Sequence, residues 1–261
     1  FIILKLTGFF LILLGSYFLF KLKEILMIIS KIKKIRDVQF YIYIAIIFLY
    51  FLLALAPLTS ADILDYHAGT ALDILRLNSY KLFPEWFTGL QAGAGEVLIA
   101  LGFAVGSEQF GSLVQFSSIL IISGIILNFS KRNKLFSSSY FLILTILTCP
   151  ILIFLLSGNK PQIFYSSLIL VSLSLNFIKY ENKKDIYKSY TIINILICCA
   201  VLGKFSFNLI GFLVWAYSSI NFVYKVKNFK ILLIPILIFI FIYAPFVYWK
   251  YLNLGGNIFT Y

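Results

Sequence analysis

Long apolar segments separated by short polar loops recur along the whole chain, and they constrain its fold more than any other feature. Eight segments approach the length that a helix needs to cross a bilayer, which is about 20 residues. They are Ile2–Phe20, Val38–Pro57, Phe110–Phe129, Tyr140–Leu156, Pro161–Ile178, Tyr190–Leu202, Phe205–Phe222 and Ile231–Tyr248. Because lipid offers the backbone no hydrogen-bond partner, each segment is expected to be helical. The sequence therefore predicts an all-α, polytopic transmembrane helical bundle with about eight spans.

The composition excludes a soluble domain. Hydrophobic residues make up 61% of the chain and charged residues only 12%, whereas soluble domains carry about 25% charged residues. Cys149, Cys198 and Cys199 lie inside apolar segments without metal-ligand spacing, so we expect small packed side chains there. The chain starts inside an apolar segment and without methionine. These features predict that residues 1–261 form a single integral membrane domain, a fragment of a longer protein.

The positions of the charges predict the orientation. The net charge is +12, and sixteen of the twenty-two basic residues fall in four loops between apolar segments. These residues are Lys21, Lys23, Lys31, Lys33, Lys34, Arg36, Lys131, Arg132, Lys134, Lys179, Lys183, Lys184, Lys188, Lys225, Lys227 and Lys230. Eight spans place all four loops on one side, which the positive-inside rule assigns to the cytoplasm. No nucleic-acid motif accompanies the charge, so we expect no nucleic-acid partner.

The opposite side receives the loop at 58–108, which holds six of the ten acidic residues. Its Thr59-Ser60-Ala61-Asp62 stretch has the spacing of a capping box, which predicts a helix that ends near Leu77. Helical spacing places Asp62, Asp65, Tyr66, Gly69, Asp73 and Arg76 on one face, and Leu64, His67, Ala68, Ala71, Ile74 and Leu75 on the other. A second helical stretch at Gln91–Val105 carries Glu96. We therefore predict two juxtamembrane helices in this outer loop.

The polar residues of the loop allow more than one role each. Asp62 is a helix cap alone or a functional acid, whereas Asp65, like Asp73, belongs to a solvated face or has a functional role. His67, on the apolar face, is a packed residue or a ligand. A divalent cation bound by Asp62, Asp65, His67 and Glu96 stays open, but their spacing is not specific for a metal. Lys204 is a snorkelling anchor or a fixed charge for a phosphate.

These residues resemble a loop of the GT-C superfamily of glycosyltransferases, and in particular the bacterial mannosyltransferase-like group. That loop reads Asp-x-x-x-Tyr-His, then Phe-Pro, then Glu-x-Leu followed by Leu-Gly. The counterparts here are Asp62 to His67, Phe83-Pro84, Glu96 to Leu98 and Leu101-Gly102. Weaker likenesses are Pro150 with Ser157-Gly158, Gly203-Lys204-Phe205 and Gly255-Gly256-Asn257. The chain departs from the pattern where members often carry another acid just before the Asp62 position.

The resemblance implies an enzyme that transfers a sugar, with inversion, from a polyprenyl-phosphate donor to a glycan, lipid or protein acceptor. It implies a bacterial inner membrane with the acidic loop on the periplasmic side, among membrane lipids. Asp62 would act as the catalytic base, with Asp65 as the second candidate. The substrate-binding residues would be Tyr66, His67, Arg76, Lys81, Glu96 and Lys204, and we expect Lys204 to hold the phosphate. The resemblance assigns no cofactor, and a divalent cation stays open.

Two other classes of protein compete with this hypothesis. A transporter or flippase for a lipid-linked or anionic substrate would place ionisable groups near the bilayer midplane and often shows internal repeats. In this chain the ionisable groups cluster in the outer loop and the two halves show no repeat. A glycan polymerase or ligase would need several outer arginines for phosphate binding, and Arg76 is the one that qualifies.

Overall fold

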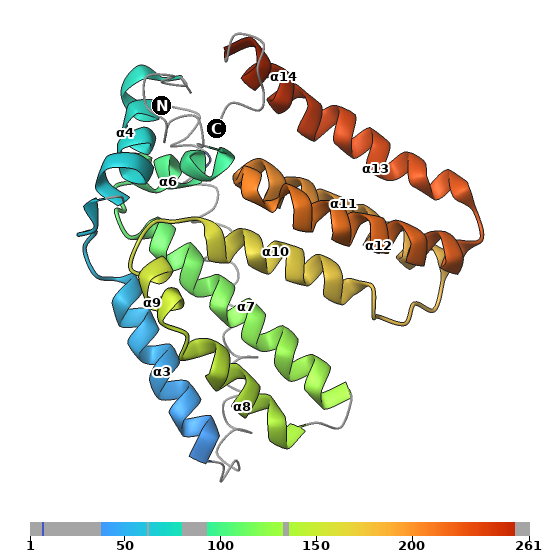
Figure 1. Cartoon of the computed structure of the whole chain (residues 1–261), viewed down its shortest axis with the longest axis horizontal. Helices are drawn as coiled ribbons and strands as arrows, with labels where there is room; N and C mark the ends of the chain where they lie inside the picture. The colour runs from blue at the N-terminus through green and yellow to red at the C-terminus, as the bar shows by residue number, and fades with distance from the viewer. Residues whose placement is uncertain (1–6, 8–37, 62, 80–92, 133–135, 254–261) are drawn as a thin grey trace. The chain divides into compact units, whose positions relative to one another are not determined.

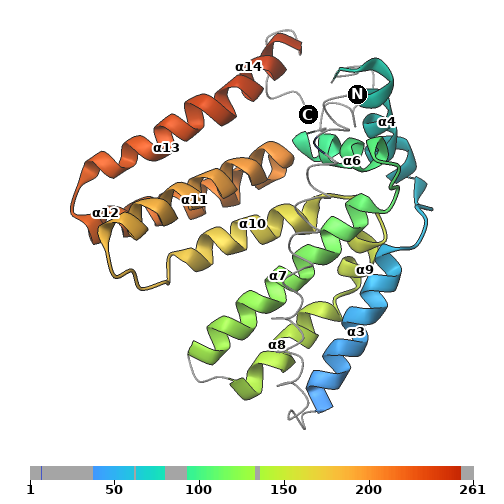
Figure 2. The same cartoon turned by 180° about the vertical axis from the view of Figure 1, so that it is seen from behind.

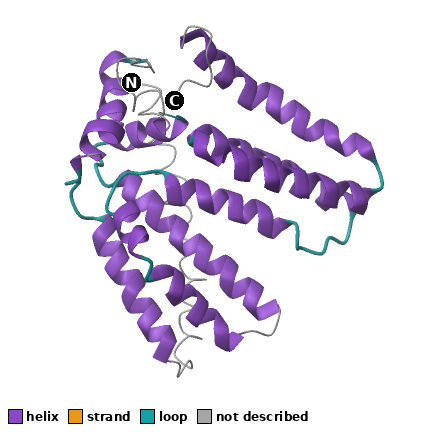
Figure 3. Cartoon of the chain, viewed as in Figure 1, coloured by secondary structure: helices purple, strands orange, loops and turns teal. Residues whose placement is uncertain are grey.

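The computed structural model describes residues 7, 38–61, 63–79, 93–132 and 136–253, and all regular elements within these ranges are helical (Figures 1 and 3). The chain divides into two compact units. The first unit comprises Phe1–Ser79, Val97–Phe116 and Ile126–Asn159, and the second comprises Tyr80–Glu96, Ser117–Ile125 and Lys160–Tyr261. The predicted span Ile2–Phe20 lies outside the described residues apart from Thr7.

The described residues up to Leu156 form seven helical elements. They are α3 (Val38–Ala54), the π-helix η1 (Ile63–Ala68), α4 (Gly69–Leu77), α6 (Ala94–Ala104), α7 (Phe110–Arg132), α8 (Phe136–Leu147) and α9 (Pro150–Leu156). Within the first unit α3 packs on α8, where the Phe40 and Tyr140 rings make an edge contact with centroids 5.8 Å apart. The Tyr50 hydroxyl of α3 also donates a hydrogen bond to the Leu147 carbonyl oxygen. These contacts pair the start of α3 with the first part of α8 and the end of α3 with the end of α8, so the two apolar helices run parallel.

A bend of 63° separates α8 from α9. The sequence predicts a span over Tyr140–Leu156, and these residues form two helices with a break between them rather than one continuous helix. Pro150 cannot donate a backbone hydrogen bond and disfavours helical geometry at the preceding residue. Cys149 accordingly has extended backbone angles, φ −67° and ψ 120°. Proline is well tolerated at the start of a helix, so the chain begins α9 in a new direction.

The second unit is built around helices that follow one another along the chain. They are α10 (Gln162–Leu175), α11 (Lys183–Gly203), the 3₁₀ turn η2 (Phe205–Phe207), α12 (Asn208–Val226), the 3₁₀ turn η3 (Phe229–Leu232), α13 (Leu233–Ile238), the π-helix η4 (Phe239–Tyr243) and α14 (Ala244–Asn253). Figures 1 and 2 show α10, α11 and α12 side by side from opposite directions. Their core is dense, because Tyr190, Ile193 and Phe222 are fully buried.

The helix α11 is longer than the span predicted at Tyr190–Leu202. It begins at Lys183, where the Asn182 side chain accepts a hydrogen bond of 2.8 Å from the Asp185 backbone N–H. An asparagine N-cap satisfies one of the unpaired donors of the first turn. The first turns are polar and add nothing to the apolar signal, so hydropathy alone missed them.

Four helices of the described residues are long and apolar enough to cross a membrane. They are Phe110–Ser130, Lys183–Gly203, Phe205–Val226 and Phe229–Leu252, and the bent pair α8–α9 makes a fifth if it counts as one span. The helices α3, α6 and α10 are apolar but shorter. The chain is thus an all-α integral membrane protein. The prediction of about eight spans is not shown, because four or five candidate spans meet these criteria.

A buried polar network joins the end of α10 to α12 in the second unit. It is centred on Asn176, the first residue after α10. Asn176 is buried, and its side-chain amide donates a hydrogen bond of 2.9 Å to the Ser218 hydroxyl. Asn221 donates to the Asn176 side-chain oxygen at 3.1 Å, and the Lys225 amino group donates to the Asn176 carbonyl oxygen at 2.9 Å. Asn176 therefore ties the end of α10 to three positions of α12.

Replacing Asn176 with alanine should lower the free energy of unfolding by about 1–2 kcal/mol, because hydrogen bonds between membrane helices are worth roughly 0.6 kcal/mol on average and at most about 1.7. The check is the thermal unfolding midpoint of the purified protein in detergent. Asn128→Ala, at an exposed position of α7, serves as the control. Equal midpoints for the two variants would show that the network adds no stability.

Candidate functional site

Asp65 and His67 of the first juxtamembrane helix lie in different environments, one exposed and the other buried. Asp65 is exposed, whereas His67 is 2% exposed. Tyr66 was predicted on the same face as Asp65, and this is wrong: Tyr66 is buried, with its ring centroid 4.2 Å from that of His67. The reason is η1, since a π-helical turn is wider than an α-helical turn and moves Tyr66 inward beside His67. Asp62 lies outside the described residues.

The end of the first juxtamembrane helix lies where the sequence analysis predicted it. The helix α4 ends at Leu77, as predicted, and Asn78 follows in the left-handed region with φ 50°. Asparagine tolerates that region better than most residues. Arg76 is exposed, and its guanidinium lies 3.8 Å from the Asp73 carboxylate. Lys81 lies outside the described residues.

Glu108 fastens the two ends of the 58–108 loop to each other within the first unit. Its side-chain oxygen accepts a hydrogen bond of 2.9 Å from the Leu58 backbone N–H. The carbonyl oxygen of Glu108 accepts a bond of 3.1 Å from the Asn159 amide, whose own oxygen accepts from the Ser112 backbone N–H at 2.9 Å. The entry to the loop and the start of α7 are therefore positioned by side-chain contacts.

Glu96, in the first turn of the second juxtamembrane helix, caps the N-terminus of that helix with its own side chain. The carboxylate is 2% exposed and accepts a hydrogen bond of 2.8 Å from the Gly93 backbone N–H, three residues before it. This is the glutamate half of a capping box. The carboxylate also interacts electrostatically with Tyr165 of α10 and Lys250 of α14. One buried acid thus connects three segments of the second unit.

Glycines let these segments approach more closely than any other residue would. A Cβ atom placed on Gly203 would overlap the Tyr165 ring, and one placed on Gly93 would lie 2.5 Å from the Gly203 carbonyl oxygen. The beginning of α6, the first turn of α10 and the end of α11 are therefore in backbone or ring contact. This packing positions Glu96, Tyr165 and Lys204 in one region.

Gly203→Ala should lower the free energy of unfolding by about 1–3 kcal/mol, because the added methyl group has no space beside the Tyr165 ring. Gly124→Ala is the matched control, since no atom lies within 4 Å of a Cβ there, and alanine is preferred over glycine in a helix by up to about 1 kcal/mol. Thermal unfolding of both variants checks this. In a Tyr165→Ala background Gly203→Ala should cost less than in the unchanged protein, and an equal cost in both would locate the clash elsewhere.

Lys204 lies at the junction of α11 and η2, as the sequence predicted. It follows the last residue of α11 with extended backbone angles, and its backbone N–H donates to the Ala200 carbonyl oxygen at 3.2 Å. When the Gln162 amide is oriented with its nitrogen toward the Lys160 carbonyl oxygen, its oxygen accepts a hydrogen bond of 2.6 Å from the Lys204 amino group. The lysine is thus held by the first residue of α10.

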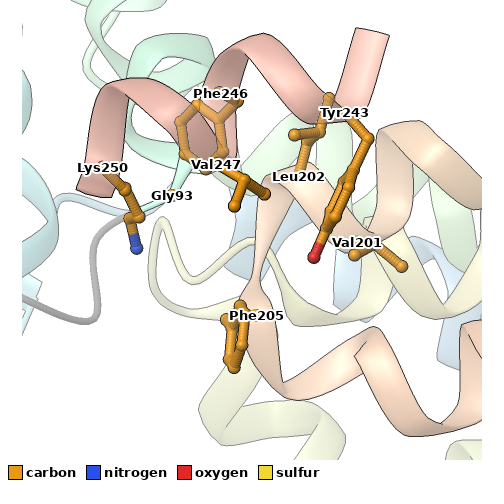
Figure 4. Close-up of a pocket in the computed structure, with 8 residues that line it drawn as sticks. All are labelled: Gly93, Val201, Leu202, Phe205, Tyr243, Phe246, Val247 and Lys250. Carbon is orange, nitrogen blue, oxygen red and sulfur yellow. The ribbon is translucent and has the colours of Figure 1, made fainter. Parts of the chain in front are cut away.

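A cavity of about 180 Å³ opens beside this junction. Its wall comprises Gly93, Val201, Leu202, Phe205, Tyr243, Phe246, Val247 and Lys250. Figure 4 shows the Lys250 amino group and the Tyr243 hydroxyl directed down from their helix toward the side on which Phe205 lies. Leu202 and Phe205, which flank Gly203-Lys204 in the sequence, both belong to this wall. We call this space the lysine cavity.

Sequence reasoning missed several residues of this region. It counted Arg76, Lys81 and Lys204 as the positive charges of the predicted outer side and passed over Lys160 and Lys250, although both belong to that side by the same topology. Lys160 is buried at 6% exposure. A signal was therefore present, namely a lysine at the end of an apolar segment opposite the four basic loops. Gln162 and Tyr165 carried no comparable signal.

The described residues do not support the cation site suggested by Asp62, Asp65, His67 and Glu96. In the described ranges no three histidine, cysteine or acidic side chains come together as metal ligands. Asp62 is outside those ranges. The region in the second unit instead combines one buried carboxylate with lysine amino groups, which suits an anionic ligand better than a cation.

The fold and this lysine-rich region define an all-α integral membrane protein with a candidate anion site at one end of its helices. Residues 12–260 match the family model of the DUF1420 N-terminal domain, and the chain belongs to this family. The family description names neither a reaction nor a ligand. No curated protein and no solved structure matches the chain.

Proposed function

We propose that the protein is a membrane glycosyltransferase that moves a sugar from a polyprenyl-phosphate donor to a glycan, lipid or protein acceptor on the outer face of the membrane. The observation that supports this best is the lysine cavity. It places Lys250 in a partly enclosed space, beside the junction that carries Lys204 and close to the buried Glu96 carboxylate. The GT-C resemblance of the 58–108 loop adds to it.

The reaction needs charge stabilisation on the leaving group. The acceptor oxygen attacks the anomeric carbon, the bond from that carbon to the phosphate oxygen breaks, and polyprenyl phosphate leaves with the bonding electrons. Fixed cations stabilise the negative charge that develops on that oxygen, and they act more strongly in a site that excludes water. Lys204 and Lys250 fill this role. Glu96 is a positioning residue, since its carboxylate accepts the Gly93 N–H and lies within electrostatic range of Lys250.

A carboxylate must take the proton from the acceptor hydroxyl. Asp62 is our first choice and Asp65 the second. The exposed position of Asp65 suits a group that meets a water-soluble acceptor. A base and its acceptor oxygen need to approach to roughly 2.6–3.2 Å in the reacting complex. Tyr66, His67, Arg76 and Lys81 remain candidates for sugar or acceptor binding.

The topology belongs to the same proposal. Eight spans in a bacterial inner membrane, with the four basic loops in the cytoplasm, place the loop at 58–108 and the lysine cavity in the outer half. Along the second unit, Lys204 lies at the opposite end of α11 from Lys183 and Lys188. The helix geometry is consistent with this assignment.

A transporter or flippase for a lipid-linked substrate is the second candidate, and broken helices favour it. The bend between α8 and α9 is 63°, and the long helix Phe229–Leu252 contains the π-helix η4. Transporters often bind substrate at interrupted helices. The two candidates differ in one respect, because a transferase breaks the sugar–phosphate bond and a transporter leaves it intact.

The deciding experiment uses membrane vesicles that contain the full-length protein, with vesicles lacking it as the control. The polyprenyl-phosphate sugar donor carries one isotope in the sugar and another in the lipid. We expect the sugar label to appear in an endogenous acceptor while the lipid label is released as polyprenyl phosphate. Movement of both labels together to the other leaflet, without a covalent product, would replace the transferase by the transporter.

A further inference from the structure

The second unit contains a larger groove that the reaction as described does not use. Its volume is about 510 Å³, and it lies between α11, α12 and the α13–η4 segment. Its lining is mainly apolar and includes Cys198, Trp215 and Phe239. This volume is in the range of roughly 300–1,000 Å³ that is typical of ligand pockets. We call it the apolar groove.

The apolar groove adjoins the lysine cavity. Val201 and Tyr243 line both spaces. The Tyr243 hydroxyl donates a hydrogen bond of 3.1 Å to the Asn208 side-chain oxygen at the groove. Tyr243 is also the last residue of the π-helix η4, and single π-helical turns recur at functional sites because they redirect side chains. Tyr243 therefore stands at the boundary between a charged space and an apolar one.

We propose that the apolar groove holds the first part of the isoprenoid chain of the polyprenyl phosphate, with the phosphate toward Lys250 and the chain passing Tyr243. This rests on the proposed function and adds the lipid subsite to it. The ligand and the two spaces match in polarity. The anionic phosphate would face Lys250 in the lysine cavity, and the apolar chain would face the aromatic and aliphatic side chains of the apolar groove. The three walls of the groove belong to α11, α12 and the Phe229–Leu252 helix, and all three are apolar and of membrane-spanning length.

The geometry favours one chain over two. Both spaces share Val201 and Tyr243 as lining residues, so the chain must enter the groove beside these two side chains. A single isoprenoid chain has one point of attachment to its phosphate and fits that arrangement. A phospholipid carries two acyl chains on one head and would need to place the second chain elsewhere.

The test is photocrosslinking in nanodiscs that contain the full-length protein. A benzophenone amino acid replaces Trp215 in the groove, and in a second variant it replaces Ile220 of α12, which is 72% exposed and outside the lining. The probe is polyprenyl phosphate with a radioactive phosphate and no sugar. We expect at least fivefold more label at position 215 than at position 220, and unlabelled polyprenyl phosphate should compete it away.

Competition with other ligands decides the source of the signal. Phosphatidylglycerol and inorganic phosphate in the same excess should leave the label at position 215 in place. Equal labelling at both positions, or equal competition by phosphatidylglycerol, would overturn the proposal.

A second pair of variants tests the groove by filling it. Cys198→Phe should weaken polyprenyl phosphate binding about tenfold, whereas Ile195→Phe, on the same helix but outside the lining, should leave binding unchanged. Equal binding by the two variants also contradicts the proposal.

These readouts need no sugar transfer. Specific labelling at position 215 in a protein that transfers no sugar would keep the lipid subsite and remove the transferase. Transfer without specific labelling would keep the transferase and remove this subsite.

Discussion

Replacing Asp62 with asparagine in the full-length protein should lower sugar transfer by about 10²–10⁴-fold, the usual contribution of a general base. Asparagine keeps the size of the side chain and removes its ability to accept the proton. The measurement is the initial rate of sugar transfer to the endogenous acceptor in vesicles that contain equal amounts of each variant. Donor binding should change little, because the phosphate and lipid contacts in the proposed site come from other residues.

Asp65→Asn is the parallel test of the second candidate, and Asp73→Asn is the control on the same helical stretch. Asp73 lies beside Arg76 at the exposed face, so its replacement should leave the rate within about twofold, as expected for a surface ion pair of small energy. If Asp65→Asn alone abolishes transfer, the base moves from Asp62 to Asp65. Full activity in both variants would remove the base from this loop.

The second large effect is expected at Lys250. Lys250→Met should reduce the rate constant for transfer by about 10²–10³-fold, the effect of removing one fixed donor that stabilises charge in the transition state. The methionine side chain keeps much of the apolar volume beside Phe246 and Val247. Because the charge on the phosphate oxygen grows as its bond to the sugar breaks, kcat should fall more than KM rises.

Lys230→Met is the matched control for this variant. Lys230 is exposed in η3, and its backbone N–H donates a hydrogen bond of 2.9 Å to the Asn228 side-chain oxygen. Lys250→Arg retains the charge and should keep an intermediate rate. Equal rates for Lys250→Met and Lys230→Met would show that the lysine cavity does not hold the leaving phosphate.

The helices were the most predictable part of the fold, because each predicted span within the described residues coincides with a helix or a bent pair. Hydropathy marks where a helix is apolar but not where it ends or turns. It therefore missed the polar first turns of α11, which depend on the Asn182 cap, and the bend that Pro150 introduces. It also missed η1, and with it the burial of Tyr66, since a π-helical turn depends on packing rather than on spacing.

The candidate site was predictable only in part. The position of Lys204 follows from the topology, and Lys250 was visible as a lysine on the same predicted side. The contact of Gly203 with the Tyr165 ring was not, because no local pattern tells which glycine faces which ring. The electrostatic interaction of Glu96 with Lys250 joins residues 154 positions apart and likewise depends on the tertiary fold.

The position of the donor phosphate is the most direct test of the central claim that Lys204 and Lys250 form the phosphate site. It can be measured in an experimental structure of the full-length protein with bound polyprenyl phosphate. We expect the phosphate oxygens within about 4 Å of the Lys250 amino group, the distance of an ion pair, and the Lys204 amino group next to them. A phosphate bound instead at the opposite end of α11, among Lys183, Lys188 and Lys225, would contradict the account.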